Sequence, residues 1–237
     1  DSVYIGGAFS SQTPLSCARP CLEGFWHWTA IHNVRYDNAT LVRIWQALLD
    51  VPSERDTYMF DIVNIGTQAL GNHFFFFFDS FTTAYRRGDL EEVISLAGQM
   101  RELLDDIDAL ASCHPQFSLK SWLDDAASWA SSPEEEAYYR RNARRIISTW
   151  GNECNIRDYG TRQWSGFVSS YCAPRWDMFF DEIIECMETG KEYDQEEFFR
   201  KCEVFEDQWA ENEQEITLKD AVDPVELSKS LIERYLL

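Results

Sequence analysis

The residues most able to do chemistry lie in one polar stretch, Trp150-Gly-Asn-Glu-Cys-Asn-Ile-Arg-Asp-Tyr159. A helical apolar face over residues 139–150 precedes it, and Gly151 with Asn152 predicts the end of that helix. The aromatic rings at its two ends could pack against the apolar face of a sugar, while the indole N–H and the phenol hydroxyl still form hydrogen bonds. Loops on rigid scaffolds often carry binding residues, so this stretch is a candidate ligand site.

Residue spacing alone also allows a structural interpretation of this stretch, and it favours that interpretation over a ligand site. Trp150 could simply be the last core residue of its helix. Glu153 and Asp158 are the carboxylates that flank the loop, and Asp158 is also well placed as the N-cap of a following helix. Arg175, which follows Pro174, could bond to the loop carbonyls or to Glu153, and it would then fix the loop rather than touch a ligand.

Other catalytic and metal-binding patterns are weak or missing in the sequence. None of the four histidines stands three residues after a Glu, as a di-iron helix pair requires. Cys17, Cys21, His27 and His32 resemble a zinc set, but the gap between Cys21 and His27 is too short for the usual finger. His73 lies in a Phe-rich helix and is expected to be a satisfied core residue. With no Gly-x-Ser-x-Gly elbow and no phosphate-binding glycine loop, we predict no metal and no cofactor.

The charge of the chain limits its partners. It has 41 acidic and 21 basic residues, a formal net charge of -20, and 19 of the acidic residues lie in residues 177–237. Such a surface repels phosphate backbones, so we expect no nucleic-acid partner. The longest purely apolar run, Phe74–Phe78, is too short to span a membrane. The chain begins with Asp1 and lacks a signal-peptide pattern, which suggests a processed product or a fragment.

Helical periodicity predicts an all-α fold. We expect an irregular linker over residues 1–36 and one domain of about eight or nine helices over residues 37–237. One long helix is expected from a cap at Asp56 to Arg87, with its five Phe buried, and another from Asp158 until Pro174 breaks it. Sharp N-terminal signals predict further helix starts at Asp89, Ser118, Ser132, Asp194 and Asp223. Of the seven cysteines, Cys17 and Cys21 lie in the irregular part and could pair.

Several motifs occur in a specific order and spacing. The main ones are the Trp150–Tyr159 stretch, Gln163 with Gly166, and Tyr171-Cys-Ala-Pro-Arg-Trp176. Shorter ones are Arg19-Pro-Cys-Leu22, Phe60–Val63 with Thr67–Ala69, Ser121–Leu123, and Tyr139 with Asn142–Arg144. Together they resemble the C-terminal domain of α-N-acetylglucosaminidases, glycoside hydrolase family 89. The resemblance covers nearly all of residues 19–237.

This resemblance implies a function for the whole enzyme and a role for this part. The helical domain would pack on a (β/α)8 barrel and close one wall of the pocket that hydrolyses terminal α-linked N-acetylglucosamine, with heparan sulfate as the lysosomal substrate. Two barrel carboxylates would serve a retaining mechanism, so no catalytic residue is expected in this chain and alone it would be inactive. A secreted, lysosomal or periplasmic location follows from the same likeness.

The resemblance also assigns roles to the loop. It implies that Trp150, Ile156 and Tyr159 line the sugar pocket. We add the hypothesis that Asn155 and Asp158 support the loop and that Arg175 braces it. The alternative function is a free-standing helical module that binds a glycan or another protein without catalysis. A long exposed apolar surface would favour the glycosidase domain, because a barrel must dock there.

Overall fold

The computed structural model describes residues 14–23, 36–51, 53–151, 156–212, 215–219 and 222–236. Within these ranges the chain forms eight α-helices and no strand, apart from one isolated bridge between Ser118 and Ser165. The prediction of an all-α fold is confirmed. No helix in the described ranges is both long enough and apolar enough to cross a membrane.

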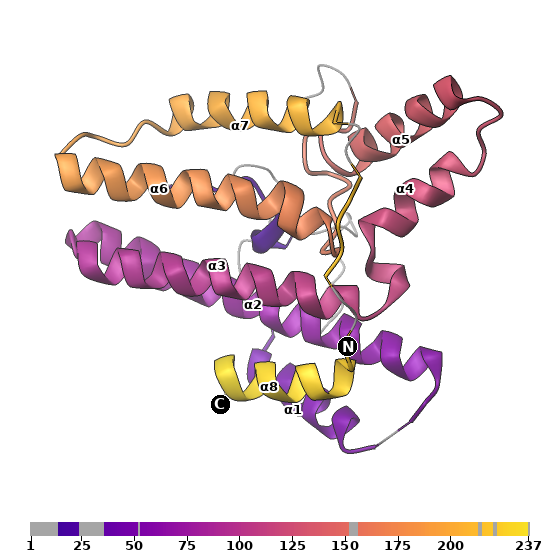
Figure 1. Cartoon of the computed structure of the whole chain (residues 1–237). Helices are drawn as coiled ribbons and strands as arrows, with labels where there is room; N and C mark the ends of the chain where they lie inside the picture. The colour runs from indigo at the N-terminus through magenta and orange to yellow at the C-terminus, as the bar shows by residue number, and fades with distance from the viewer. Residues whose placement is uncertain are drawn as a thin grey trace.

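Two long antiparallel helices form the centre of the fold (Figure 1). α2 (Asp56–Arg87) ends at Gly88, whose φ of 70° reverses the chain, and α3 (Leu90–Ser112) begins two residues later, after its N-cap Asp89. The Asp89 side chain accepts the Glu92 N–H and caps α3 as predicted. The predicted cap at Asp56 is wrong in detail, because Arg55 holds the N-cap position without a side-chain bond.

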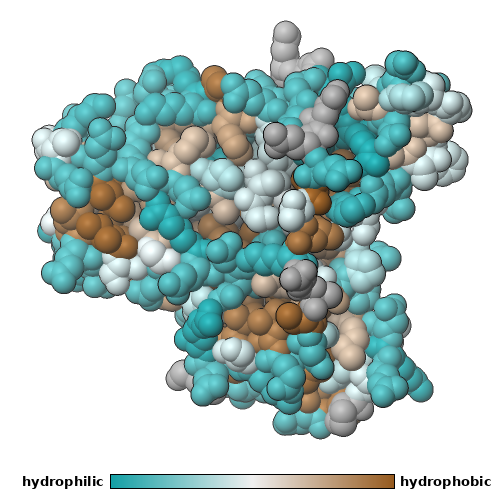
Figure 2. All heavy atoms as spheres, in the orientation of Figure 1, coloured by the Kyte–Doolittle hydropathy of each residue, from teal (hydrophilic) through white to brown (hydrophobic). Residues whose placement is uncertain are grey.

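The remaining helices surround this pair. α6 (Ala173–Thr189) lies along α3, and α7 (Gln195–Ala210) lies along the other side of α6 (Figure 1). α1 (Asn38–Leu49) and α8 (Pro224–Tyr235) pack against α2. Figure 2 shows mainly hydrophilic residues over α7, as expected from the acidity of this part of the chain, and hydrophobic residues at the surface between α3 and α8.

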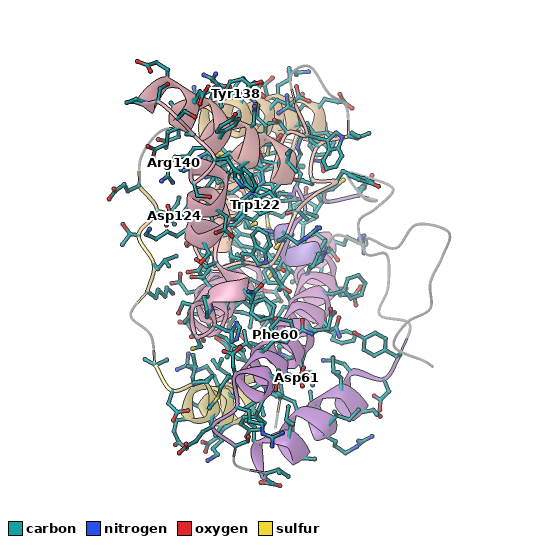
Figure 3. The ribbon with its side chains drawn as sticks, turned by 90° about the vertical axis from the view of Figure 1, so that its right-hand side faces the viewer. Phe60, Asp61, Trp122, Asp124, Tyr138 and Arg140 are labelled. Atoms are coloured by element: carbon teal, nitrogen blue, oxygen red, sulfur yellow. The ribbon has the colours of Figure 1, made fainter. Side chains whose placement is uncertain are left out.

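α4 (Leu119–Ala127) and α5 (Pro133–Ile147) form a hairpin that projects from one end of the bundle (Figure 1). Ser118 caps α4 and Ser132 caps α5, as predicted. Arg140 Nη1 donates to Asp124 Oδ1 at 3.0 Å, and the Trp122 indole donates to the Ala143 carbonyl at 3.0 Å (Figure 3). These bonds fix α5, which leads directly into the Trp150 loop.

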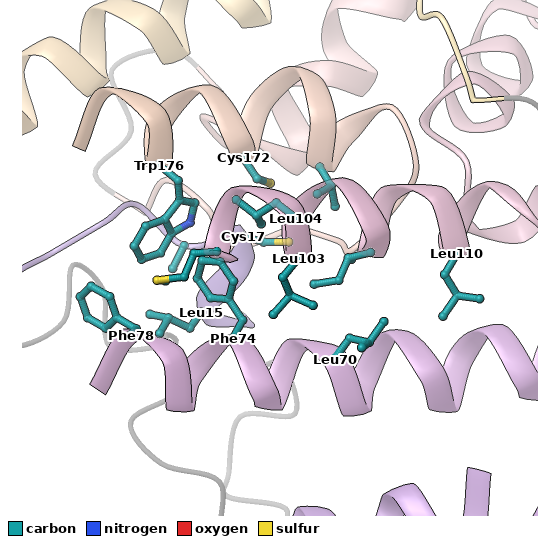
Figure 4. Close-up of a cluster of buried hydrophobic side chains, with 14 of the residues drawn as sticks. Leu15, Cys17, Leu70, Phe74, Phe78, Leu103, Leu104, Leu110, Cys172 and Trp176 are labelled. Atoms are coloured by element: carbon teal, nitrogen blue, oxygen red, sulfur yellow. The ribbon is translucent and has the colours of Figure 1, made fainter. Parts of the chain in front are cut away.

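The core contains residues that the sequence suggested were outside the domain. Leu15 and Cys17 belong to a short 3-10 turn (Leu15–Cys17) and lie buried between α2 and α6, close to Cys172 (Figure 4). The Trp176 indole donates to the Ser16 carbonyl at 3.1 Å. Residues 14–23, called here the N-terminal segment, therefore contribute to the helical core. The domain division at residue 36 stays a prediction.

Burial of the five consecutive Phe residues is uneven, contrary to the expectation. Phe74 and Phe78 are buried, with their ring centroids 4.8 and 5.3 Å from that of Trp176. Phe76 is 44% exposed. A helix turns by about 100° per residue, so five consecutive side chains cannot all face one core. Cys17 and Cys21 carry free thiols, so the pairing left open by the sequence does not form.

The helix expected from Asp158 is wrong. Residues 157–160 form a turn, and helical structure begins at residue 167. It passes through one π-helical turn (Val168–Cys172), at the end of which the Ala173 N–H donates to the Val168 carbonyl. The chain then continues without a break as α6. Pro174 does not break this helix, because the wider turn directly before it accommodates a residue that has no N–H to donate.

Candidate functional site

The structure brings Trp150 and Tyr159 into contact. Their rings meet edge to face, with centroids 4.7 Å apart and planes at 74°. Trp150 is 38% exposed, whereas Tyr159 and Ile156 are half-buried. Trp150 is therefore not a buried core residue, as the second interpretation of the sequence would require. Asn155 lies outside the described residues.

The backbone around this pair is strained. Trp150 has a φ of 61° and Asp158 a φ of 64°, and they alone among the described non-glycine residues have a positive φ. For an L-residue the left-handed conformation costs roughly 1–2 kcal/mol. Such strain persists only where neighbouring structure enforces it, and it is frequent at ligand sites. Here the Trp150 N–H donates to the Arg145 carbonyl, and the Asp158 N–H donates to the Ser148 carbonyl at 2.8 Å.

Gly160 allows the turn to pack closely against the end of α5. A Cβ atom at this position would lie 2.2 Å from the Ile146 carbonyl oxygen and 3.1 Å from the Trp150 ring. Any side chain would therefore push the turn away from α5 and disturb Trp150. Gly160 was not among the predicted site residues, although a glycine next to Tyr159 in a polar loop was a usable signal.

Asp158 anchors the turn from the protein interior. Its buried carboxylate accepts hydrogen bonds from the Arg19 backbone N–H at 3.2 Å, the Tyr171 hydroxyl at 3.0 Å and Arg175 Nη1 at 2.9 Å. Burial raises the pKa of the Asp158 carboxyl, and the positive charge of Arg175 opposes that shift. The side chain is thus bound to distant residues, and the predicted role as a helix N-cap is wrong.

Arg175 connects the turn to three other parts of the fold. Its Nη1 donates to Asp158 and, at 2.8 Å, to Glu206 on α7, and its Nη2 donates to the Cys17 carbonyl at 2.8 Å. The guanidinium also lies 4.0 Å from the centroid of the Tyr171 ring. Burial alone would lower the pKa of Arg175, but Asp158, Tyr171 and Glu206 outweigh it, so this pKa is well above its ordinary value.

Three members of this buried network were not among the predicted site residues. Arg19 gave a partial signal, because the Arg19–Leu22 stretch is one of the motifs. Tyr171 likewise belongs to the Tyr171–Trp176 motif. Glu206 gave none, since it stands among many acidic residues of an acidic helix.

Two clefts of the described surface lie away from the loop. One, of about 360 Å³, lies between the α4–α5 hairpin and residues 211–212 and 215–216. The other, of about 450 Å³, adjoins it and lies between residues 166–170, the end of α7 and residues 215–217. Arg144, Asn212, Glu215 and Ile216 line both, and neither includes Trp150 or Tyr159. Among the described residues no group of three His, Cys, Asp or Glu side chains could hold a metal ion.

Comparison with known proteins gives a consistent picture. A family model described as "Alpha-N-acetylglucosaminidase (NAGLU) C-terminal domain" matches residues 2–234. Human α-N-acetylglucosaminidase is 26% identical over 207 residues, which cover 86% of this chain and 28% of that protein.

Two solved structures of a family 89 glycoside hydrolase from Clostridium perfringens share the fold. The complex with PUGNAc has a TM-score of 0.81 at 22% identity and covers 95% of this chain and 27% of that one. The complex with "its substrate GlcNAc-alpha-1,4-galactose" has a TM-score of 0.82 at 23% identity, covering 94% and 26%. The chain thus spans little more than a quarter of these relatives. Because the family model covers nearly its whole length, this chain belongs to the family of α-N-acetylglucosaminidase C-terminal domains, glycoside hydrolase family 89.

Proposed function

We propose that this domain closes one wall of the active site of a family 89 glycosidase, and that Trp150, Ile156 and Tyr159 contact a terminal α-linked N-acetylglucosamine. The observation that carries the proposal is the Trp150–Tyr159 ring pair. It is partly exposed, and Trp150 and the neighbouring Asp158 both hold an unfavourable positive φ. Aromatic rings pack well against the apolar faces of sugars. The ligand names of the Clostridium perfringens complexes support the same substrate class.

A second domain supplies the catalytic groups. Retaining glycosidases use two carboxylates about 5 Å apart on either side of the scissile bond. Asp158 cannot serve as one of them, because it is buried and its oxygens are occupied by Tyr171, Arg175 and the Arg19 N–H. We assign the catalytic carboxylates to a (β/α)8 barrel, and the roles of Asp158 and Arg175 to support of the loop. Asn155 keeps its hypothetical supporting role.

The surface beside the loop fits docking to that barrel. Ile146 is 47% exposed at the end of α5, and its carbonyl faces Gly160. Together with Trp150, which is 38% exposed, it offers apolar surface beside the loop. A barrel face placed over these residues would bury them and complete the pocket.

Hydrolysis of an aryl α-N-acetylglucosaminide tests this function. We would assay the chain alone, a separately produced family 89 barrel alone, and the two together. Activity that rises strongly only in the mixture is the expected result. Activity of the chain alone would contradict the proposal, because a carboxylate of this domain would then be catalytic. Saccharide binding by the chain without any gain in the mixture would favour the free-standing binding module.

A further inference from the structure

Glu206 on α7 is the point at which three arginines from different segments meet. Its buried carboxylate accepts Arg19 Nε and Nη2 at 3.0 and 2.6 Å, Arg175 Nη1 at 2.8 Å and Arg157 Nη1 at 3.3 Å. Arg19 belongs to the N-terminal segment, Arg157 to the turn that carries Tyr159, and Arg175 to α6. One side chain therefore joins three segments that are distant in the sequence.

Arg157 links Glu206 to the proposed sugar wall. It directly precedes Asp158 and stands two residues before Tyr159. Its Nη1 also donates to Asp207 at 2.8 Å, so two adjacent carboxylates of α7 hold the turn from one side. Asp158 holds the same turn from the interior through Arg175.

We propose that Glu206 is a positioning residue that sets Tyr159 against Trp150, acting through Arg157 and Arg175. The consequence for catalysis rests on the proposed function, but the positioning itself does not. The left-handed conformation of Asp158 is unfavourable and requires neighbours that enforce it. The competing explanation is that Glu206 only joins α6 to α7, in which case its loss would loosen both helices and the turn alike.

The different exposure of the three arginines explains why the turn would respond first. Arg19 and Arg175 are fully buried, whereas the Arg157 side chain is 11% exposed and already contacts the exposed Asp207. If the Glu206 charge is removed, buried guanidiniums lose an acceptor in a site with little water, which is unfavourable. Arg157 can relieve this by moving outward toward water and Asp207. That movement would carry Asp158 and Tyr159 with it.

Glu206→Gln in the 237-residue chain tests the positioning, with Glu203→Gln as the matched control. Glu203 lies on the same helix, and its carboxylate, which is 47% exposed, approaches Arg19 at 3.5 Å. Amide hydrogen exchange by NMR would follow the Asp158 N–H, which donates to the Ser148 carbonyl at 2.8 Å. In Glu206→Gln we expect this exchange to accelerate about tenfold or more, while interior amides of α6 and α7 change less than about twofold.

The same samples report on the rings. The NOE between the Trp150 and Tyr159 rings, whose centroids are 4.7 Å apart, should weaken in Glu206→Gln and remain in Glu203→Gln. Equal acceleration of exchange across α6, α7 and the turn would overturn the proposal. If Glu206→Gln does not fold, Arg157→Gln makes the test, because it removes the links from Glu206 and Asp207 to the turn and leaves Arg19 and Arg175 on Glu206. Asp207→Asn, which removes only the Asp207 link, is its control. Unchanged Asp158 exchange in that variant would equally overturn the proposal.

A double-mutant cycle in the mixture with the barrel separates this inference from the proposed function. We expect Glu206→Gln to raise KM in this mixture. If Glu206 acts through the aromatic wall, this rise should largely disappear in a Trp150→Ala background. Independent, additive effects would contradict action through the wall. If Trp150→Ala alone changes neither kcat nor KM, the proposed function fails, whereas the exchange result still decides the positioning.

Discussion

Asp158 and Arg175 form a buried ion pair, with Arg175 Nη1 2.9 Å from Asp158 Oδ2, between a turn and the first turn of α6. The pair fixes the backbone next to Tyr159, and Tyr159 in turn contacts Trp150. The partly exposed aromatic wall is therefore supported by buried charges directly behind it. This arrangement makes the loop sensitive to substitutions that do not touch a ligand.

Asp158→Asn should strongly destabilise the domain. Asn tolerates the left-handed conformation and keeps the shape of the side chain, but it removes the charge that pairs with Arg175. Breaking a buried ion pair costs about 3–5 kcal/mol, and urea unfolding would measure this loss. Asp207→Asn is the control, because Asp207 is an exposed partner of Arg157, and it should cost less than about 1 kcal/mol. Equal losses in the two variants would contradict the anchoring role of Asp158.

Gly160→Ala should destabilise the domain and displace Trp150. The new Cβ would lie 2.2 Å from the Ile146 carbonyl oxygen, so the turn must shift. We expect a loss of about 1–3 kcal/mol in the free energy of unfolding, typical of overpacking. Gly98→Ala on α3 is the matched control, since a Cβ there meets open space, and it should raise stability by up to about 1 kcal/mol. If both variants were stabilised, the close packing at Gly160 would be refuted.

Trp150→Ala should weaken catalysis in the mixture with the barrel. Loss of one wall contact should lower kcat/KM by an amount that corresponds to about 1–3 kcal/mol. Trp129→Ala, at the 82% exposed tip of the α4–α5 hairpin, is the control and should leave kcat/KM unchanged. An unchanged kcat/KM with unchanged stability would remove Trp150 from the pocket. Loss of folding would instead assign Trp150 a role in the stability of the domain.

His73 should make the domain less stable in mild acid. Burial on α2, where its ring lies 4.5 Å from that of Phe77, lowers the pKa of His73. The unfolded chain binds this proton below a pH of about 6.5, before the folded chain does. The contribution of His73 to the free energy of unfolding is therefore fully present above that pH. It is lost as the pH falls toward the lowered pKa. The free energies of unfolding of wild type and His73→Gln, measured in urea, should diverge across this pH window. The same pH dependence in both proteins would contradict the lowered pKa of His73.

The buried thiols should react slowly in the folded protein. Burial raises the pKa of Cys21 to about 11 and that of Cys202 to about 12, so little thiolate exists at neutral pH. Alkylation with iodoacetamide at pH 8, followed by mass spectrometry, should modify both only after unfolding. A peptide containing a Cys17–Cys21 disulfide would contradict the free thiols of the structure.

Helix ends could be predicted from the sequence because they depend on neighbours a few residues away. The Asp194 side chain accepts the Glu196 and Glu197 N–H groups, and Asp223 accepts those of Val225 and Glu226, as their sequence positions implied. Gly88 ends α2 for an equally local reason, since its φ of 70° suits a glycine. The all-α fold follows from the sum of such signals and the helical spacing of apolar residues.

The sequence by itself determined the all-α fold, most helix starts, the acidic surface and the polar loop between Trp150 and Tyr159. Only the tertiary structure decided what Asp158 does. A helix cap needs only the amides two or three residues ahead, and the sequence was compatible with that role. A carboxylate removed from water instead requires a cation and hydrogen-bond donors, and Arg175, the Arg19 N–H and the Tyr171 hydroxyl supply these from other segments. Because desolvation makes such partners obligatory wherever they lie in the chain, no local pattern could reveal them.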